Sequence, residues 1–374
     1  MRVDPALEQA WRIGGCTFEV FCRATRPGTP LDVDLDVAAG GVAMTDEPGV
    51  RAVLSMQVAM RPGLWDTLAP LGTRLVPVLR TRAGHSRWDT RFGVFEVEEQ
   101  SLTYDGSGVL SVTAPDLWVR VRNRRLDRSV VANGNAVDIA VAYAREALGP
   151  DVPVTKIERS TVTVRGLVFE DDREELIDEL LTLAGRVAYI DRDGGLVVER
   201  PRTLTGGGSA AWPVDPFHDG VLAVGTRSRS SAPVRNRIIV RSASGRYPQQ
   251  TVQDANPSSP TRVSGPMGPR PLIVTTSRAQ TATQANLVGR DVLRWSTATG
   301  AETTASTVPH YGLDPTDPVA VTFPAQGGDG WASERHLLAS VDHPFPQRGQ
   351  PATQSLTMRS TRPDGGEDID EDTP

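Results

Sequence analysis

The sequence predicts a mainly β protein in which two β-barrel-like domains flank a small α+β domain. Three observations support this fold class. Short apolar runs separated by turn residues fill the first and last thirds of the chain. Helical periodicity is strongest in the middle. Proline (29) and glycine (35) are frequent, which suits many short strands better than a helical bundle.

Residues 1–122 are expected to form the first β-barrel-like domain. The run Leu31–Val37 alternates strictly, with Leu31, Val33, Leu35 and Val37 on one face, which predicts a half-buried strand. No clear helix is expected in this segment. Further strands are predicted at 16–22, 52–60, 74–80, 91–97 and 109–113, with a turn at 105–108.

Residues 123–205 are expected to form the α+β domain. One helix is predicted at 135–148, with Asn133 or Asn135 as its cap. A second is predicted from Asp171 or Asp172 to Ala184, because leucines recur on one face and acidic residues gather at its positive N-terminus. The turn at 191–195 predicts a hairpin between strands at 187–190 and 196–199.

Residues 206–362 are expected to form the second β-barrel-like domain, with one helix at 281–295. A glycine-rich linker at 203–211 precedes it, and a long, mobile loop is expected at 245–270. Residues 363–374 are acidic without apolar clusters and predict a disordered tail. Strands are predicted at 221–227, 236–242, 273–275, 303–308, 319–323, 337–341 and 354–358.

Composition argues against several classes of protein. The net charge of −6 and pI near 5.5 offer no basic excess for phosphates, so no direct nucleic-acid recognition is expected. No run of about 18 apolar residues occurs, so no membrane-spanning segment is expected, and the N-terminus lacks the apolar core of a signal peptide. Cys16 and Cys22 fit no zinc pattern and are interpreted as ordinary small apolar residues.

The chain carries no motif of known chemistry. Gly206-Gly207-Gly208 lacks the Lys-Ser/Thr of a phosphate loop, and no nucleophile elbow or paired-histidine metal motif occurs. His336 and His343 are interpreted as ordinary polar residues. We therefore predict no catalytic, cofactor-binding or metal-binding residues, no cofactor, and no enzyme activity. The remaining histidines are His85, His218 and His310.

Two acidic patterns could bind a cation, and each also has a simpler structural interpretation. Asp32, Asp34 and Asp36 share one strand face, which could hold a hard cation or be the wet face of a half-buried strand; the wet face is preferred. Asp191 and Asp193 resemble the start of a calcium loop, but an apolar strand follows at once, so a hairpin turn is preferred.

Seven tryptophans are scattered along the chain. A sugar-binding face could use such rings, but no strand gathers them, so packing in a core or an interface is the preferred interpretation. They are Trp11, Trp65, Trp88, Trp118, Trp212, Trp295 and Trp331.

Five stretches occur in an informative order. They are the turn and strand at 64–75, the strand at 91–97, the helix and hairpin at 172–198, the strand at 234–240 and the turn at 313–319. Together with the order of parts, they resemble the baseplate hub, or tail-tip hub, proteins of long-tailed phages and contractile injection systems, over roughly residues 40–360. In the last stretch, Thr316 stands where a glycine is usual in the family, so a wider turn is expected.

This resemblance implies a homotrimeric ring that joins a sixfold tail tube or distal tail ring to a threefold tip. The ring would close the tail lumen until genome or cargo ejection. The implied partners are the distal tail or tail tube protein, the tape-measure protein and a tip or central fibre protein. The protein would be synthesised in the host cytoplasm and reside at the virion tail tip. The resemblance supplies no catalytic residues.

Two other functions compete with the hub. One is a carbohydrate-binding adhesin or minor tail protein that contacts the host surface, which an exposed row of tryptophans would favour. The other is a hydrolase, which a deep pocket with two convergent carboxylates would favour.

Overall fold

The computed structural model describes the chain in ten stretches. Several sequence predictions fall outside them, namely those for residues 105–107, the linker at 203–211 with its three glycines, His218 and the tail at 363–374. The described residues are 4–13, 16–28, 31–103, 108–202, 212–214, 222–257, 259–298, 301–324, 331–347 and 352–359.

The first part of the chain is built from short strands, as predicted, but it begins with a helix that was not expected. In α1, Asp4 accepts a hydrogen bond from the Ala6 amide at 2.8 Å and Pro5 opens the first turn. Leu7 and Trp11, four residues apart, are buried. The elements are α1 (Pro5–Ile13), β1 (Thr17–Thr25), β2 (Asp32–Thr45), β3 (Ala52–Ala59), α2 (Leu64–Thr67), β4 (Arg74–Ala83), β5 (Ser86–Arg91), β6 (Phe95–Glu96), β7 (Glu99–Thr103) and β8 (Val109–Pro115).

Two strand predictions in this part need correction. The expected strand at 91–97 is broken between β5 and β6, where Phe92 and Phe95 both turn into the core. A side chain at Gly93 would clash with Phe95, since a Cβ there would lie 2.8 Å from the ring. On β2, Leu35 is buried as predicted but Val33 is 39% exposed, because the start of this strand extends past the apolar cluster.

The middle of the chain is α+β, and its two long helices and hairpin are confirmed. The Asn135 side chain caps α4 by accepting from the Val137 and Asp138 amides, and Asp172 caps α5 by accepting from the Glu175 amide. The hairpin of β12 and β13 is antiparallel. The elements are α3 (Val119–Asn123), β9 (Val130–Asn135), α4 (Ala136–Leu148), β10 (Val154–Ile157), β11 (Thr163–Phe169), α5 (Arg173–Leu183), β12 (Val187–Ile190) and β13 (Leu196–Glu199).

The last part combines a long helix with further strands, and the predicted helix at 281–295 is confirmed as α6. The turn before β20 is not wider than usual: the Asp317 amide donates to the Asp314 carbonyl at 3.1 Å, and Thr316 itself adopts φ 73°. The elements are β14 (Trp212–Val214), β15 (Leu222–Arg229), β16 (Arg237–Ser242), β17 (Gln250–Gln253), β18 (Pro271–Thr276), α6 (Ala282–Ala298), β19 (Ala301–Thr307), β20 (Pro318–Pro324), β21 (Trp331–Pro344) and β22 (Gln354–Arg359).

The predicted loop at 245–270 contains one strand, β17, and a fixed anchor. Asn236 is fully buried, and its amide donates to the carbonyls of Thr261 (2.7 Å) and Gly268 (2.8 Å). Its carbonyl oxygen accepts from the Arg270 amide at 2.7 Å. One side chain therefore satisfies three backbone groups of this loop, which holds the loop against β16.

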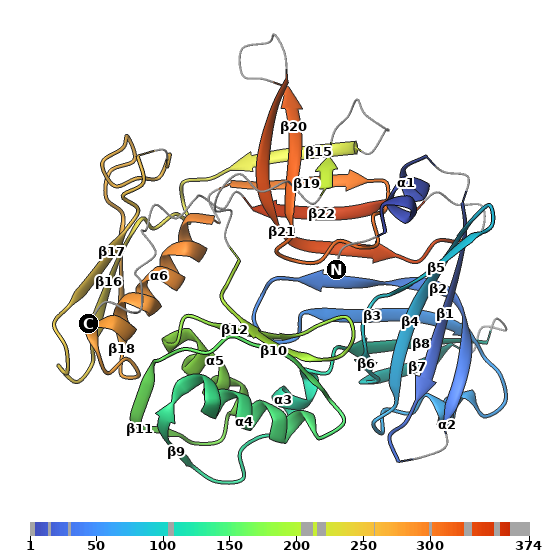
Figure 1. The fold of residues 1–374 in the computed structure, drawn as a ribbon, viewed down its shortest axis with the longest axis horizontal. Helices are drawn as coiled ribbons and strands as arrows, with labels where there is room; N and C mark the ends of the chain where they lie inside the picture. The colour runs from blue at the N-terminus through green and yellow to red at the C-terminus, as the bar shows by residue number, and fades with distance from the viewer. Residues whose placement is uncertain are drawn as a thin grey trace.

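The mainly β class is confirmed, and strands from both ends of the chain share one 14-stranded sheet. Its central path runs β15-β19-β22-β21-β2-β1-β4-β5, and none of the four sheets closes on itself within the described strands. In Figure 1 the blue strands of the first part lie against the red strands of the last part. The α+β part lies below them, and β16–β18 with α6 lie to the left.

Strands β2 and β21 are the two 14-residue strands at the centre of this sheet, and their neighbours correspond. The first residues of β2 pair with β1, and its later residues pair with β3. In the same way, the first residues of β21 pair with β20, and its later residues pair with β22. Farther across the sheet, β3 pairs with β8, which pairs with β7. Likewise, β22 pairs with β19, which pairs with β15. We call these two sets of strands the first and second β units.

The two β units join where the ends of β2 and β21 pair antiparallel, from Gly41↔Pro344 to Thr45↔Ser340. Glycine is required at this junction. A Cβ at Gly40 would lie 2.2 Å from the Ser55 carbonyl oxygen, and one at Gly41 would lie 2.8 Å from the His343 carbonyl oxygen. Gly40 and Gly41 therefore let β2 pass between β3 and β21.

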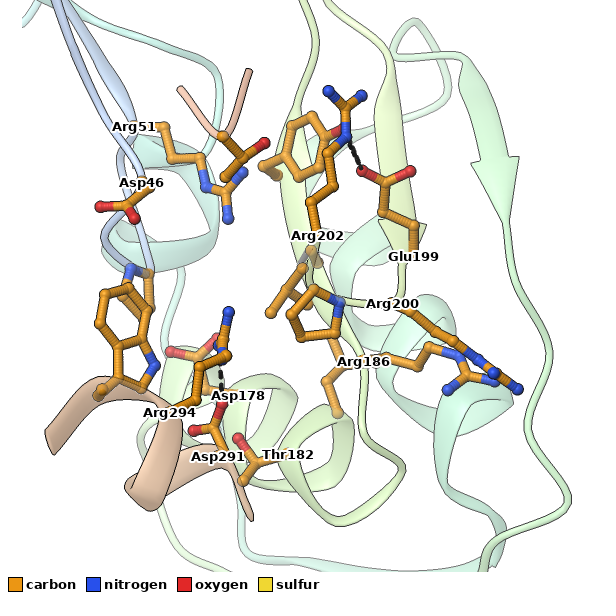
Figure 2. A pocket seen from close by; sticks show the side chains of 18 residues that line it. Asp46, Arg51, Asp178, Thr182, Arg186, Glu199, Arg200, Arg202, Asp291 and Arg294 are labelled. Atoms are coloured by element: carbon orange, nitrogen blue, oxygen red, sulfur yellow. Dashed lines mark hydrogen bonds and ion pairs between the residues drawn. The ribbon is translucent and has the colours of Figure 1, made fainter. Parts of the chain in front are cut away.

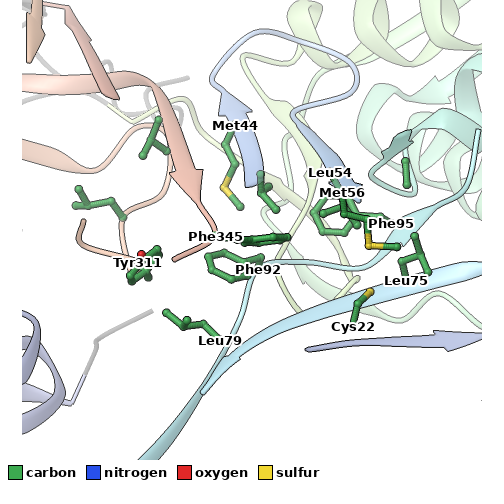
Figure 3. Close-up of a cluster of buried hydrophobic side chains, with 14 of the residues drawn as sticks. Cys22, Met44, Leu54, Met56, Leu75, Leu79, Phe92, Phe95, Tyr311 and Phe345 are labelled. Carbon is green, nitrogen blue, oxygen red and sulfur yellow. The ribbon is translucent and has the colours of Figure 1, made fainter. Parts of the chain in front are cut away.

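Buried apolar side chains form two clusters. One lies inside the shared sheet and draws on both β units; Figure 3 shows Phe92 and Met44 of the first near Tyr311 and Phe345 of the second. The other joins the α+β part to β16, β18 and α6. The expected domain limits at 122, 205 and 362 stay a prediction.

Candidate functional site

A small pocket lies where the first β unit, the α+β part and α6 meet. Figure 2 shows residues of the β2–β3 connection on one side, β12 and the end of β13 on the other, and α5 and α6 below. Its volume of about 110 Å³ is below the 300–1,000 Å³ typical of small-molecule sites. Five arginines and four acidic residues line it: Arg51, Arg186, Arg200, Arg202, Arg294, Asp46, Asp178, Glu199 and Asp291.

Arg51 enters this pocket from the position just before β3, where a buried carboxylate fixes the backbone. Asp116 accepts from the amides of Arg51 (2.8 Å) and Ala52 (2.9 Å), and from the Trp118 amide (2.8 Å). Burial raises the pKa of Asp116 to about 6, although these hydrogen bonds oppose the change. The Arg51 guanidinium lies over the Tyr189 ring, 4.3 Å from its centroid, which is a cation–π contact.

Glu199, on the opposite wall, is buried and well partnered. It accepts from the Tyr189 hydroxyl and from Lys156 Nζ, both at 2.8 Å, and Arg202 Nε lies 3.7 Å away. Burial and the hydrogen bond to Glu199 raise the pKa of Tyr189. Arg202 also pairs with Asp317 at 3.0 Å. The chain of contacts connects β13 to the turn before β20.

Asp178 differs from the other acidic residues of the pocket. Among the described residues, no ion pair or hydrogen bond engages its side chain. Burial, followed by repulsion from Glu174 and Asp172, raises its pKa to about 7, and attraction to Arg51 only partly opposes this. The carboxyl is therefore partly protonated at neutral pH.

A second charged junction joins the β12–β13 turn to the second β unit. The Arg192 side chain, 10% exposed, pairs with Asp314 at 2.5 Å and donates to the carbonyls of Tyr311 (2.6 Å) and Leu313 (2.5 Å). Because guanidinium presents five donors in a fixed fork, one arginine can satisfy all these acceptors.

His343 lies beside Arg192 in a buried polar network. Its Nε2 donates to the Leu313 carbonyl at 3.0 Å, and its Nδ1 accepts from Gln354 at 2.8 Å, which assigns the neutral tautomer. Burial and the nearby Arg192 charge lower the pKa of His343. Gln354 also accepts from the His310 amide at 2.9 Å. These residues act as structural hydrogen-bond partners between β21, β22 and the preceding loop.

The acidic residues and the histidine that the sequence analysis considered as metal ligands make local contacts. Asp32 pairs with Arg23 and Asp36 with Arg61 on the exposed face of β2. Asp191 accepts from the Asp193 and Gly195 amides within the confirmed hairpin turn. His336 is buried, and burial lowers its pKa to about 4. Among the described residues, no group of three His, Cys, Asp or Glu side chains is placed to hold a metal ion.

The cysteines and tryptophans are mostly packed inside. Both cysteines are unbridged; Cys22 is fully buried and Cys16 is half-buried. Trp11, Trp118 and Trp212 are buried, whereas Trp65 is 42% exposed. The Trp331 side chain lies outside the described part. No helix in the described stretches is long and apolar enough to cross a membrane.

Three solved structures share this fold over more than nine tenths of the chain. One is the 43 kDa tail protein of prophage MuSo2 from Shewanella oneidensis (14% identity, TM-score 0.61, 92% of this chain and 99% of that one). Another is a tail protein from Neisseria meningitidis MC58 (12%, 0.63, 91% and 96%). The third is prophage tail protein gp18 from Listeria monocytogenes EGD-e (14%, 0.58, 91% and 94%).

No family model and no curated protein sequence matches the chain. At 12–14% identity, the likeness defines the fold: the chain folds as these tail proteins do along nearly its whole length.

Proposed function

We propose that this protein is a structural baseplate or tail-tip hub, which forms a homotrimeric ring in the tail of a phage-like particle. The ring joins a sixfold tail tube or distal tail ring to a threefold tip and closes the lumen until ejection. The observation that carries this proposal is the pair of corresponding β units centred on β2 and β21. Three chains would supply six such units, the number that a sixfold ring requires.

The shape of the sheet supports assembly through strand edges. Strands β5 and β15 end the central path of the 14-stranded sheet, and β7 and β14 end two of its branches. Each presents one edge without a partner strand in the described chain. Unpaired edges favour pairing with another chain, so these four strands are the places where a neighbouring copy or a tail ring protein would dock.

The same geometry favours a structural role over catalysis. Of the four acids in the pocket, three are engaged by arginine, lysine or tyrosine side chains. The pocket thereby joins parts of the chain, which suits a structural component of a ring. The tape-measure protein, the tail tube or distal tail ring and a tip or central fibre protein are the proposed partners, and the virion tail tip is the proposed location.

The test is the solution mass of the full chain, measured by light scattering after size exclusion over a concentration series. A species near three times the 40.2 kDa chain mass, with threefold class averages in negative-stain images, would support the hub. A monomer at all concentrations up to about 100 μM, well above the affinity range of stable assemblies, would contradict a self-assembling ring.

A further inference from the structure

The chain from 230 to 290 is strongly basic, although the chain as a whole is acidic. It contains eight arginines and one acidic residue, Asp254, which gives a formal charge of +7. The whole chain carries −6, so the remaining residues together carry −13. Within the described chain, Arg278 alone of the eight forms ion pairs, with Glu175 and Glu179. A local excess of one sign attracts partners of the opposite sign, which the total charge of a protein conceals.

This basic segment folds into a small sheet that a helix covers on one side. Strands β17, β16 and β18 pair in that order, and α6 packs against one face. Ile238 and Val240 are fully buried on that face. The helix approaches so closely that a Cβ at Gly289 would lie 2.8 Å from Val252 Cγ2. In Figure 1 this sheet forms the left edge of the molecule, outside the two β units.

The opposite face of this sheet presents two arginines with an isoleucine between them. Successive side chains of a strand point to opposite faces, so Arg237, Ile239 and Arg241 lie on the face away from α6. The parallel pairing places Ile273 of β18 beside Ile239, and Ile273 is 51% exposed. We call these four residues the Arg/Ile patch. Exposed side chains complete this face, namely Thr251, Gln253, Pro271 and Thr275.

Among the described residues, no carboxylate forms an ion pair with Arg237 or Arg241, the two cations of this patch. Arg241 Nε donates to the side-chain oxygen of Gln249 at 3.1 Å, which is a neutral acceptor. Arg237 Nε is buried and has no hydrogen-bond partner in the described chain. Asp254, the one acid of this segment, accepts instead from two hydroxyls, including that of Thr261 at 2.6 Å. The positive charge of the patch is therefore available to an anion from another molecule.

The composition of the patch distinguishes between classes of anionic partner. A guanidinium binds a carboxylate or a phosphate through paired hydrogen bonds, so its charge alone fits either a protein or a nucleic acid. Single-stranded nucleic acids stack their bases on aromatic rings, and the one aromatic residue between 230 and 290, Tyr247, is buried. Ile239 and Ile273 instead offer an apolar contact beside the two charges. The partner that fits is a protein segment whose carboxylates flank an apolar side chain.

We propose that the Arg/Ile patch is a docking surface for an acidic segment of a partner protein. Two carboxylates of that segment bind Arg237 and Arg241, and an apolar side chain between them packs against Ile239 and Ile273. An extended segment matches this spacing, because its side chains on one face also recur at every second residue. The inference goes beyond the hub and does not depend on ring formation, since the patch belongs to a sheet outside both β units.

The test measures the fluorescence anisotropy of labelled probes titrated with the full chain at about 50 mM salt, where charges are only partly screened. The main probe is a peptide with two copies of the sequence Glu-Ser-Ile-Ser-Glu. A matched peptide carries serine in place of each isoleucine, and an oligothymidylate represents nucleic acids. We expect the isoleucine peptide to bind about fivefold more tightly than the serine peptide, because the patch buries part of an apolar side chain.

Substitutions identify the surface. Arg237→Gln/Arg241→Gln should weaken binding of the isoleucine peptide about tenfold, because both charge-assisted contacts are lost. Arg124→Gln/Arg128→Gln is the matched control, since it removes the same charge from exposed positions between α3 and β9. The control should change the affinity less than about twofold, because these positions are remote charges that salt screens.

A third variant separates the apolar contact from the charges. Ile273→Thr keeps a β-branched residue in β18 and removes part of the apolar surface. It should weaken binding of the isoleucine peptide about threefold and leave the serine peptide unchanged. Arg241→Glu, at an exposed position, takes the place of the double variant if that variant does not fold. Circular dichroism checks the fold of every variant.

Several results would overturn the proposal. Equal losses in the two double variants would show nonspecific attraction, and equal affinity for the two peptides would show that the isoleucines make no contact. Tighter binding of the oligothymidylate, lost in Arg237→Gln/Arg241→Gln, would assign the surface to a nucleic acid. A gain in peptide affinity of about tenfold when the six acids of residues 363–374 are replaced by Asn or Gln would assign it to this chain's own acidic end. No peptide binding at about 200 μM chain would also contradict it.

Discussion

Arg192 Nε donates to Asp314 Oδ1 at 2.5 Å, and this contact joins two residues 122 positions apart in the chain. It fixes the β12–β13 turn of the α+β part against the second β unit. The same guanidinium donates to two backbone carbonyls, so three groups accept from one largely buried side chain. Removal of this arginine leaves the Asp314 carboxylate and the Tyr311 carbonyl without this donor, while the Leu313 carbonyl keeps only the His343 side chain.

Arg192→Met should therefore lower the free energy of unfolding by about 3 kcal/mol, because a buried pair loses one partner. Urea denaturation at pH 7 measures it. Arg125→Met is the control: Arg125 and Asp171 form an exposed pair, whose loss should cost no more than about 0.5 kcal/mol. A loss for Arg192→Met as small as that of the control would contradict a structural role for this junction.

Thr316→Gly should stabilise the protein by about 1 kcal/mol. Thr316 is β-branched and holds φ 73°, a left-handed conformation that only glycine adopts without strain. We expect the free energy gained by relieving this backbone strain to exceed the cost of the extra conformational entropy that glycine gives the unfolded chain. Thr357→Gly, within β22, should instead destabilise by about 1 kcal/mol. Thermal unfolding of both variants measures the effect, and a lower melting temperature for Thr316→Gly would refute the strain.

Asp178 should make stability depend on pH. Its folded pKa of about 7 exceeds the ordinary value of 3.8, so the folded state binds the proton more tightly than the unfolded state. The stabilisation that comes from this group is complete below about pH 4, where the carboxyl is protonated in both states. It is lost as the pH rises through about 7, where the folded state also releases the proton. Asp178→Asn should remove this loss and stabilise the protein at pH 8 by about 1–2 kcal/mol, after allowance for partial exposure.

The measurement for Asp178 is urea denaturation of the native chain and the variant at pH 5 and pH 8. The gain should be larger at pH 8. Asp127→Asn, at an exposed position, should show no such difference. An equal effect of Asp178→Asn at both pH values would mean that the carboxyl titrates normally.

Asn236→Ala should release the segment from 254 to 270. The alanine cannot satisfy the Thr261 and Gly268 carbonyls or the Arg270 amide, so we expect a loss of about 2–3 kcal/mol. Limited proteolysis should cut this segment faster in the variant than in the native chain. Asn256→Ala is a control on the same segment. Cleavage rates that match in all three proteins would show that Asn236 does not anchor the loop.

The sequence was most informative where local chemistry decides the structure. Asn135 and Asp172 cap the two predicted helices because their side chains accept from amides two or three residues ahead. The α1 helix was missed although Asp4-Pro5 and the Leu7/Trp11 spacing signal it. The break at Gly93 was missed because residues 91–97 read as a continuous apolar strand, and only the packing of Phe95 shows the conflict.

The pocket could not be predicted from the sequence. Its members come from eight separate elements or connections, and Arg51 lies in the connection between β2 and β3. Asp178 carries a weak signal, since Asp178 and Glu179 lie between the apolar pairs Leu176–Ile177 and Leu180–Leu181 on α5. The pairing of β2 with β21 depends on contacts about 300 residues apart, for which the sequence offers only the two adjacent glycines at the crossing.

That pairing also sets an order for folding during synthesis. The edge of β2 at Gly41–Thr45 finds its partner only after residues 340–344 have left the ribosome. Until then, the first β unit exposes both an unpaired strand and the apolar side chains that later meet Tyr311 and Phe345. Contacts so distant in sequence slow folding and leave a nascent chain open to aggregation. Premature termination just before β21 would thus yield a fragment in which the β2 edge stays unpaired and Leu338, Val341 and Phe345 are missing from this core.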